Sequence, residues 1–190
     1  MGIKYTTENQ MEDMLIKQLT LGDSQWTYRD DLKTEEQLWN NLKSKLEQNN
    51  IDILNNVLIT NQEMSQIKNQ LSFSSFYEAS RWLVGENGIA KVRVQREDAK
   101  LGTIYLKAFS RADIAGGISS YEVINQFQSS KKEPLDRERR FDVSLLINGI
   151  PMIHIELKNR SHPYKEAFNQ INRYQKHSYG SGKALFQSVQ

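Results

Sequence analysis

The 190-residue sequence contains no cysteine, which excludes a disulfide framework and a thiolate metal site and favours an intracellular setting. It has no apolar run near the roughly 18 residues of a membrane-spanning helix. Internal repeats and low-complexity tracts are also absent from the sequence. The length suits one domain, residues 1–190, that is large enough for a hydrophobic core.

Charge is distributed unevenly, although the formal net charge is only +2. Residues 1–90 contain 8 Lys and Arg against 13 Asp and Glu, which gives −5, whereas residues 91–190 contain 17 against 10, which gives +7. A basic half is typical of proteins with an anionic partner such as nucleic acid, but a solvated charged surface produces the same imbalance. Charge alone leaves both interpretations open.

Apolar spacing predicts helices first and strands later. Four helices are expected at residues 11–19, after the potential cap Thr7, and at 35–46, 61–70 and 74–84. Alternation then predicts strands at residues 92–94, 104–106, 121–127, 141–147 and 151–158, with a charged loop over 131–140. A final helix is expected from Tyr164 to His177, and residues 184–189 have the pattern of a strand that is just beginning. This order predicts an α/β fold with a helical N-terminal half.

The segment IHIELK, residues 153–158, combines the alternation of a strand with charged residues. Alternation places its three aliphatic residues on one face, suited to a core, and His154, Glu156 and Lys158 on the other. Asp142 lies near the start of the preceding predicted strand. Two adjacent carboxylates repel unless a divalent cation such as Mg²⁺ binds them, and a neighbouring lysine can hold water or stabilise charge on a phosphate. The set therefore fits metal-assisted phosphodiester hydrolysis.

An acid two residues before a lysine is a weak signal by itself, since it also occurs at Asp31 and Asp98 in polar segments. The alternative for Glu156 and Lys158 is an ion pair on the solvated face of an antiparallel sheet. His154 can either approach the site or be a hydrogen-bonded bystander. The hairpin alone does not decide between these interpretations.

Hairpin register provides a geometric test. A strict two-residue turn at Asn148-Gly149 would pair Asp142 with Ile155, which places Asp142 on the face away from Glu156. A three-residue loop with a bulge would instead pair Asp142 with Glu156. We therefore predict an irregularity near residues 148–151.

These residues carry a resemblance to a known family. RFDVSLLINGIPMIHIELKNR followed by EAFNQINRYQ resembles the N-terminal nuclease domain of the R (HsdR-type) subunit of type I restriction enzymes, within the PD-(D/E)xK superfamily. ENQMEDMLIKQL and VINQF resemble the opening helix and a strand of that family. One departure is Phe141, which stands before Asp142 in place of the proline that names the superfamily. The resemblance implies a restriction-endonuclease-like mixed β-sheet flanked by α-helices.

The family pattern also implies roles for individual residues. Those implied to be catalytic are Asp142, Glu156, Lys158, Gln170 and Tyr174. Those implied to bind metal are Asp142, Glu156, the Leu157 carbonyl and an acid of the first helix, for which we prefer Glu12 to Glu8. Basic residues that could neutralise DNA phosphates are Arg140, Arg160, Lys165 and Arg173. The alternatives are a solvated charge for Glu12, surface charges for the basic residues, and a helix packed on the core for the segment that contains Gln170.

The same resemblance implies double-stranded DNA as substrate and Mg²⁺, replaceable by Mn²⁺, as cofactor. It implies a complex with methyltransferase (M) and specificity (S) subunits in the prokaryotic cytoplasm. ATP and S-adenosylmethionine would act only in the full complex. The sequence is then expected to be the N-terminal fragment of a longer subunit whose motor is absent, because Gly180–Ala184 lacks the flanking residues of a phosphate-binding loop. The alternative function is a non-catalytic docking or DNA-binding module that retains the fold.

Overall fold

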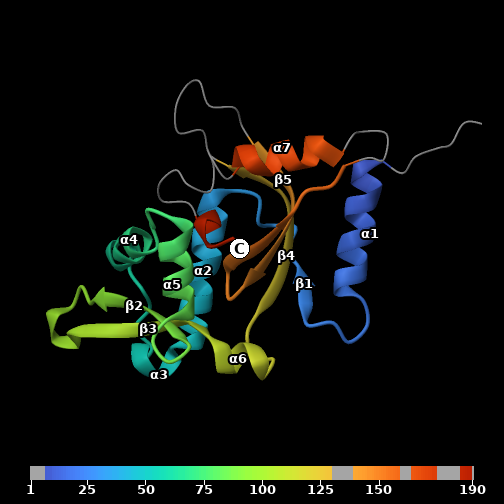
Figure 1. Ribbon diagram of the computed structural model, residues 1–190. Helices are drawn as coiled ribbons and strands as arrows, with labels where there is room; N and C mark the ends of the chain where they lie inside the picture. The colour runs from blue at the N-terminus through green and yellow to red at the C-terminus, as the bar shows by residue number, and fades with distance from the viewer. Residues whose placement is uncertain (1–6, 130–138, 159–163, 175–184, 190) are drawn as a thin grey trace, which may run out of the picture.

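The computed structural model describes residues 7–129, 139–158, 164–174 and 185–189 (Figure 1). Its α-helices are α1 (Glu8–Thr20), α2 (Glu35–Asn49), α3 (Ile51–Leu54), α4 (Asn61–Gln70), α5 (Phe76–Val84), α6 (Arg111–Ala115) and α7 (Tyr164–Tyr174). Its strands are β1 (Trp26–Tyr28), β2 (Ile89–Gln95), β3 (Thr103–Ser110), β4 (Tyr121–Ser129), β5 (Arg139–Ile147) and β6 (Ile150–Ile155), and short 3₁₀ helices are η1 (Ala99–Leu101) and η3 (Leu185–Ser188). The predicted α/β class with a mixed sheet between helices is confirmed.

Three helices begin at a threonine that satisfies free N–H groups of the first turn. Thr7, Thr34 and Thr60 each accept a hydrogen bond from the backbone N–H three residues later, and the Gln or Glu at that position bonds back to the N–H of the threonine. Such a capping box contributes on the order of 1 kcal/mol to a helix start. The predicted cap at Thr7 is therefore confirmed, and α1 begins directly after it.

The central sheet has the strand order β1-β4-β5-β6. β1 runs parallel to β4, whereas the other two pairs are antiparallel. Helix α1 lies against one face of the sheet (Figure 1) and buries Ile16 against the strand residues Val123, Val143 and Leu145. Sequence analysis predicted no strand at β1, because three residues are too few to show alternation.

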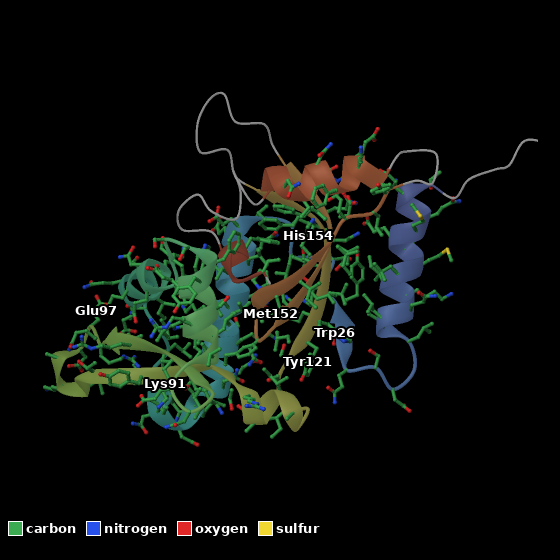
Figure 2. The ribbon with its side chains drawn as sticks, viewed as in Figure 1. Trp26, Lys91, Glu97, Tyr121, Met152 and His154 are labelled. Atoms are coloured by element: carbon green, nitrogen blue, oxygen red, sulfur yellow. The ribbon has the colours of Figure 1, made fainter. Side chains whose placement is uncertain are left out.

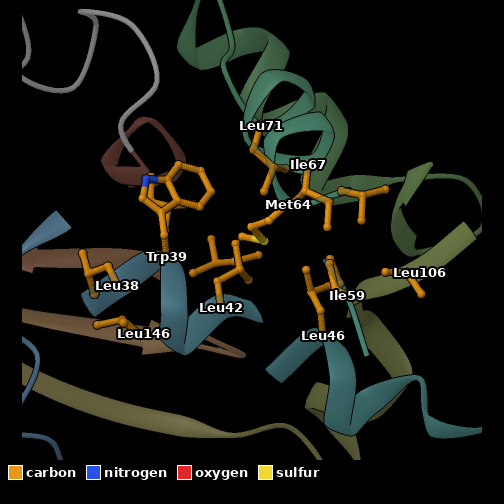
Figure 3. Packing of buried hydrophobic residues seen from close by; sticks show 14 of the residues in the cluster. Leu38, Trp39, Leu42, Leu46, Ile59, Met64, Ile67, Leu71, Leu106 and Leu146 are labelled. Atoms are coloured by element: carbon orange, nitrogen blue, oxygen red, sulfur yellow. The ribbon is translucent and has the colours of Figure 1, made fainter. Parts of the chain in front are cut away.

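Helix α2 covers the opposite face of the sheet and buries the larger core (Figure 3). Its leucines recur every four residues and form one apolar stripe, Leu38, Leu42 and Leu46. The stripe belongs to one cluster that also contains strand and helix residues, namely Ile124, Leu146 and Ile150 from the central sheet, Met64 and Ile67 from α4, and Val92, Val94 and Leu106 from the β2-β3 pair. The central sheet is thus held between α1 on one face and α2 on the other.

The turn between β5 and β6 is a strict two-residue turn. Ile147 pairs with Ile150, and the two residues between them have φ of 51° (Asn148) and 78° (Gly149). Positive φ at both central residues matches the right-handed twist of a hairpin. A Cβ on Gly149 would lie 3.0 Å from the Leu42 Cα, so close packing against α2 also requires glycine. The predicted three-residue loop is therefore wrong.

The predicted one-residue register shift is present, but it lies within β6 rather than in the turn. The ladder slips by one residue near Leu145, where Met152 becomes the extra residue. Beyond this bulge Val143 pairs with Ile155. Continued by one residue, this register sets Asp142 opposite Glu156.

Strand β6 ends at Ile155, three residues earlier than predicted, so residues 156–158 follow the last ladder pair. Ile155 and Leu157 pack partly buried near the α1 face, as expected for the aliphatic side of the segment. Ile153 differs, because 47% of its surface is exposed. The main contacts of α1 are with β1, β4 and β5, so this helix does not cover the part of β6 that carries Ile153.

The strand predicted at residues 184–189 is wrong, because Leu185–Ser188 forms the 3₁₀ helix η3. Its adjacent residues Leu185 and Phe186 are both buried, whereas a strand would point them to opposite sides. Phe186 stacks on Phe141 with ring centroids 4.7 Å apart and lies 4.8 Å from the Phe127 ring. One tight turn therefore seals the β4-β5 end of the core.

Two further predictions fall partly outside the described residues. The charged loop predicted at 131–140 includes Arg139 and Arg140, which instead belong to β5 and pair with Ser129 and Gln128 of β4. The rest of that loop, residues 131–138, lies outside the described residues. The predicted final helix is present as α7 to Tyr174, and its last three predicted residues lie outside the described residues.

Candidate active site at the end of the β5-β6 hairpin

Asp142 lies in β5, and its carboxylate reaches the segment that follows β6. Its Oδ2 accepts a 2.8 Å hydrogen bond from the backbone N–H of Leu157. Leu157 stands between Glu156 and Lys158, so this bond holds the acid of β5 beside the acid and the lysine of the hairpin. The bulge at Met152 makes this meeting possible, because the unshifted register would set Asp142 against Ile155.

Burial raises the pKa of Asp142 to about 6, above its ordinary value of 3.8. The Leu157 N–H opposes this shift because it stabilises the carboxylate, and the nearby charge of Glu156 adds to the shift. Asp142 is thus a carboxyl group with too little compensating positive charge around it. A cation bound beside it would favour the ionised form.

The Glu156 side chain is fully buried between two basic neighbours. The His154 Nε2 lies 3.3 Å from Glu156 Oε2, and the Lys158 Nζ lies 3.1 Å from Oε1. Lys158 forms an ion pair with Oε1, a buried oxygen for which the described residues provide no other polar contact. The Lys158 ammonium therefore balances the charge on the Oε1 side of the buried carboxylate.

Lys158 is the positive centre of this group. Burial acts to lower its pKa, but the contact with Glu156 and the charges of Glu8 and Asp142 outweigh burial and raise the pKa above its ordinary value. Lys158 therefore stays protonated while it lies beside the two hairpin acids.

Helix α1 brings two acids toward the same end of the sheet. Glu8 Oε2 lies 3.8 Å from Lys158 Nζ. Glu12 is buried and accepts hydrogen bonds from the side-chain amides of Asn125 and Gln126 in β4. The negative charge of Glu12 also contributes to the raised pKa of Asp142. Both candidate helical acids thus lie near the site, Glu8 through the lysine and Glu12 through β4.

Helix α7 crosses the end of the sheet near β5 (Figure 1) and carries the other predicted residues. Gln170 is partly buried, and Lys165 is exposed. The side chains of Tyr174 and Arg173 and the whole of Arg160 lie outside the described residues.

Arg140 is exposed at the start of β5, and its Nε donates to the Gln126 side chain. Arg140 therefore lies two residues before Asp142 and is linked through Gln126 to Glu12.

Sequence reasoning missed three residues around the site. Ser144 lies 3.4 Å from the His154 Nδ1, and its position two residues after Asp142 in a strand was a usable signal. Asn125 and Gln126 gave no signal, because polar amides inside an apolar strand have no distinctive spacing. Gln126 has φ of 55° within β4, an uncommon conformation for a residue with a Cβ. The pairs on either side, Asn125 with Val143 and Phe127 with Phe141, set it opposite Asp142. Such local strain is often found beside functional residues.

The donor set fits a hard divalent cation. The described residues contain no group of three or more His, Cys, Asp or Glu side chains arranged to hold a metal. Mg²⁺ commonly needs only one or two carboxylates, with water or substrate oxygens completing its shell. Asp142, with its raised pKa, and Glu156, with its unsatisfied Oε1, supply such a pair.

The fold and the site thus define an α/β protein in which two acids and a lysine meet beside a sheet hairpin. The chain belongs to the family described as type I restriction enzyme R protein N terminus, whose pattern matches residues 5–190. Membership of this family agrees with the resemblance carried by the hairpin and α7.

Curated relatives support the same assignment. The chain is 28% identical over 188 residues, 98% of its length, to the type I restriction enzyme SsaAORF53P endonuclease subunit of Staphylococcus saprophyticus. It is 29% identical over 187 residues, also 98% of its length, to the SauCOLORF180P endonuclease subunit of Staphylococcus aureus strain COL. The chain spans 18% of the length of each of these two relatives. The chain is also 38% identical over 94 residues, 50% of its length, to the EcoprrI endonuclease subunit of Escherichia coli. This match covers 28% of that subunit. Within the described ranges, none of the helices has the length and apolar character needed to cross a membrane.

Proposed function

We propose that this chain is the endonuclease part of a type I restriction enzyme R subunit and hydrolyses phosphodiester bonds of double-stranded DNA with Mg²⁺. The single observation that carries the proposal is the meeting of Asp142, Glu156 and Lys158 through the bulged hairpin. If Glu156 and Lys158 were only a solvated ion pair on a sheet face, Glu156 would not need to be buried. Nor would Asp142 need to accept a hydrogen bond from Leu157, which lies between them. The names of the curated relatives support a nuclease role.

In this proposal Asp142 and Glu156 are the metal ligands, and the Leu157 carbonyl is a further oxygen donor. When bound there, the metal would supply Lewis-acid activation of the phosphodiester and of a water molecule. A bound metal would lower the pKa of Asp142 again, because a neighbouring cation favours the ionised acid. Mn²⁺ should substitute for Mg²⁺, because both accept oxygen ligands.

Lys158 is proposed to orient the attacking water or to stabilise charge that develops on the phosphate. Its ammonium already lies 3.1 Å from Glu156 Oε1 and is kept protonated by the surrounding acids. Gln170 and Tyr174 of α7 would position DNA or support the active site. The residues proposed to neutralise phosphates remain Arg140, Arg160, Lys165 and Arg173.

The R-subunit assignment extends the proposal beyond this chain. Cleavage would be coupled to ATP-driven translocation by a longer subunit in a complex with M and S subunits, and S-adenosylmethionine would act at the level of that complex. The relatives are more than five times as long as the matched region, which leaves room for such a motor.

The test uses a full-length subunit that contains this sequence, assembled with its M and S partners. Asp142→Ala, Glu156→Ala and Lys158→Ala should each abolish DNA cleavage while ATP hydrolysis stays largely intact. Asp98→Asn is the matched control, because Asp98 also precedes a lysine by two residues but caps the 3₁₀ helix η1 far from the hairpin. A variant that cuts DNA at the normal rate would refute the role of its residue.

Metal binding separates this proposal from a non-catalytic module that retains the fold. Titration calorimetry of the 190-residue chain should show Mn²⁺ uptake that is lost in Asp142→Ala. Equal uptake by both proteins would favour the docking or DNA-binding alternative.

A further inference from the structure

Behind Glu156 lie two side chains, Ser144 and His154, that the proposed nuclease chemistry does not use. Ser144 Oγ lies 3.4 Å from His154 Nδ1, and His154 Nε2 lies 3.3 Å from Glu156 Oε2. Ser144 and His154 face one another across the β5-β6 ladder, and Glu156 follows two residues after the histidine. Figure 2 shows His154 at the end of the sheet nearest α7, beyond Met152 along β6.

Donor and acceptor roles in these two contacts are consistent with a neutral histidine. If Nε2 carries the proton and donates to Glu156 Oε2, then Nδ1 is free to accept the hydroxyl proton of Ser144. Both ring nitrogens are then satisfied without a net charge. The Ser144–His154 and His154–Glu156 distances are at the long end of the hydrogen-bond range. These contacts therefore orient the side chains and are not strong bonds.

Burial excludes a nucleophilic role for Ser144. The side chains of His154 and Glu156 are 2% and 0% exposed, and Ser144 is 1% exposed. A serine this deeply buried cannot attack a substrate, so the order serine, histidine, acid is not a nucleophilic triad. The Phe141 and His154 rings pack in a T-shaped arrangement, with centroids 5.0 Å apart and planes at 76°, which restrains the imidazole.

We propose that His154 is a positioning residue that orients the Glu156 carboxylate through Oε2 and thereby presents Oε1 to the metal. This inference rests on the proposed function of Glu156 as a metal ligand. It explains why Oε1, and not Oε2, is the buried oxygen with no hydrogen-bond partner among the described residues. Hydrogen-bonded partners of metal ligands commonly set affinity by fixing the ligand before the metal arrives.

Two substitutions separate orientation from packing. His154→Leu fills the space without a donor, whereas His154→Gln can place an amide N–H near the position of Nε2. We expect Mn²⁺ dissociation constants, measured by calorimetry on the 190-residue chain, to rise about tenfold in His154→Leu and to return within about threefold of wild type in His154→Gln. Thermal unfolding of each variant reports whether the fold is intact.

The contrary outcomes are distinct. Wild-type affinity in a folded His154→Leu would overturn the inference, and so would equal weakening by leucine and glutamine, since packing alone would then explain the loss. The contact itself is measured without metal by the ring ¹⁵N signals of His154 in long-range proton-nitrogen spectra, a tractable assignment because the chain has three histidines.

We expect a protonated Nε2 whose signal shifts in Glu156→Gln. Identical spectra in wild type and Glu156→Gln would overturn the contact and with it the positioning role. Failure of the wild-type chain to bind Mn²⁺ would instead refute the metal site of the proposed function, while the spectra would still decide whether His154 restrains Glu156.

Discussion

The Oδ2 of Asp142 and the backbone N of Leu157 are 2.8 Å apart, so a strand acid is bonded to the main chain between the other two residues of its motif. Because the donor is a backbone N–H, the bond depends on register and not on the identity of the side chain at position 157. Any change that restores the unshifted hairpin register would therefore break it. The position of the bulge therefore determines whether Asp142 reaches the Leu157 N–H.

Asp142→Asn should stabilise the protein at neutral pH. The folded-state pKa of about 6 lies above the ordinary value of 3.8, so the stability gained from the protonated acid is present below pH 3.8 and is lost as pH rises through 6. Asparagine mimics the protonated acid and keeps an acceptor for Leu157. Each pKa unit corresponds to about 1.4 kcal/mol, which solvent screening at this partly exposed group reduces to roughly 1 kcal/mol in total.

Urea unfolding without metal at pH 4 and pH 7 tests this expectation. The advantage of Asp142→Asn should be small at pH 4 and should grow to its full size at pH 7. A stability difference of the same size at pH 4 and pH 7 would show that the pKa of Asp142 is not raised in the folded protein.

Gly149→Ala should destabilise the hairpin more than a comparable glycine elsewhere. Its φ is 78°, and a Cβ would meet the Leu42 backbone at 3.0 Å, so strain and collision with α2 add to one another. Gly22→Ala is the matched control, with φ of 64° and no atom within 4 Å of the added Cβ. We expect a loss of about 1 kcal/mol for Gly22→Ala from backbone strain and roughly 2–4 kcal/mol for Gly149→Ala. Equal losses in chemical denaturation would mean that the turn is free to move away from α2.

Arg96→Met should be among the most damaging single changes far from the site. Arg96 Nε lies 2.9 Å from Glu63 Oε1, both side chains are buried, and the guanidinium also donates to the carbonyls of Val57 and Leu58. Without Arg96, the buried Glu63 carboxylate has no opposite charge beside it, which lowers the free energy of unfolding by about 3–5 kcal/mol.

The control for Arg96→Met is Lys43→Met, which removes a more exposed ion pair of 3.9 Å with Glu47. Its effect should stay below about 1 kcal/mol. Similar midpoints for the two variants in thermal unfolding would contradict the structural importance of the Glu63 pair.

Glu12→Gln should weaken Mn²⁺ binding more than Glu8→Gln. Glu12 is buried and its charge acts on Asp142, whereas Glu8 is more exposed and contacts Lys158 at 3.8 Å. We expect a loss of roughly three- to tenfold in affinity for Glu12→Gln and little change for Glu8→Gln. Calorimetry on both variants decides which helical acid supports the site, and the reverse order would transfer that role to Glu8.

The pattern of the hairpin could be predicted, but the place of its irregularity could not. Asn148-Gly149 has the residues of a two-residue turn, and the turn follows that local rule. The register shift comes directly after Pro151, with Met152 as the extra residue. Periodicity carries no information about such a slip, because a bulge changes pairing without changing the order of residues.

Tertiary packing accounts for the other differences between expectation and structure. Residues 185–188 have strand-like composition, yet the stacking of Phe186 on Phe141 and Phe127 favours a tight turn. The Gln126 side chain likewise has partners distant in sequence, since its Nε2 donates to Glu12 and its Oε1 accepts from Arg140. Local sequence rules do not include such partners.

Strand β6 lies at the edge of the central sheet in the described part of the chain, and Ile153 on it is 47% exposed. An open sheet edge invites a strand of another molecule to add to it and so to begin aggregation. Pro151 withholds one donor from that edge, and the bulge at Met152 interrupts the regular spacing that an incoming strand would need. The irregularity that aligns the two acids thus also limits sheet growth between molecules at high protein concentration.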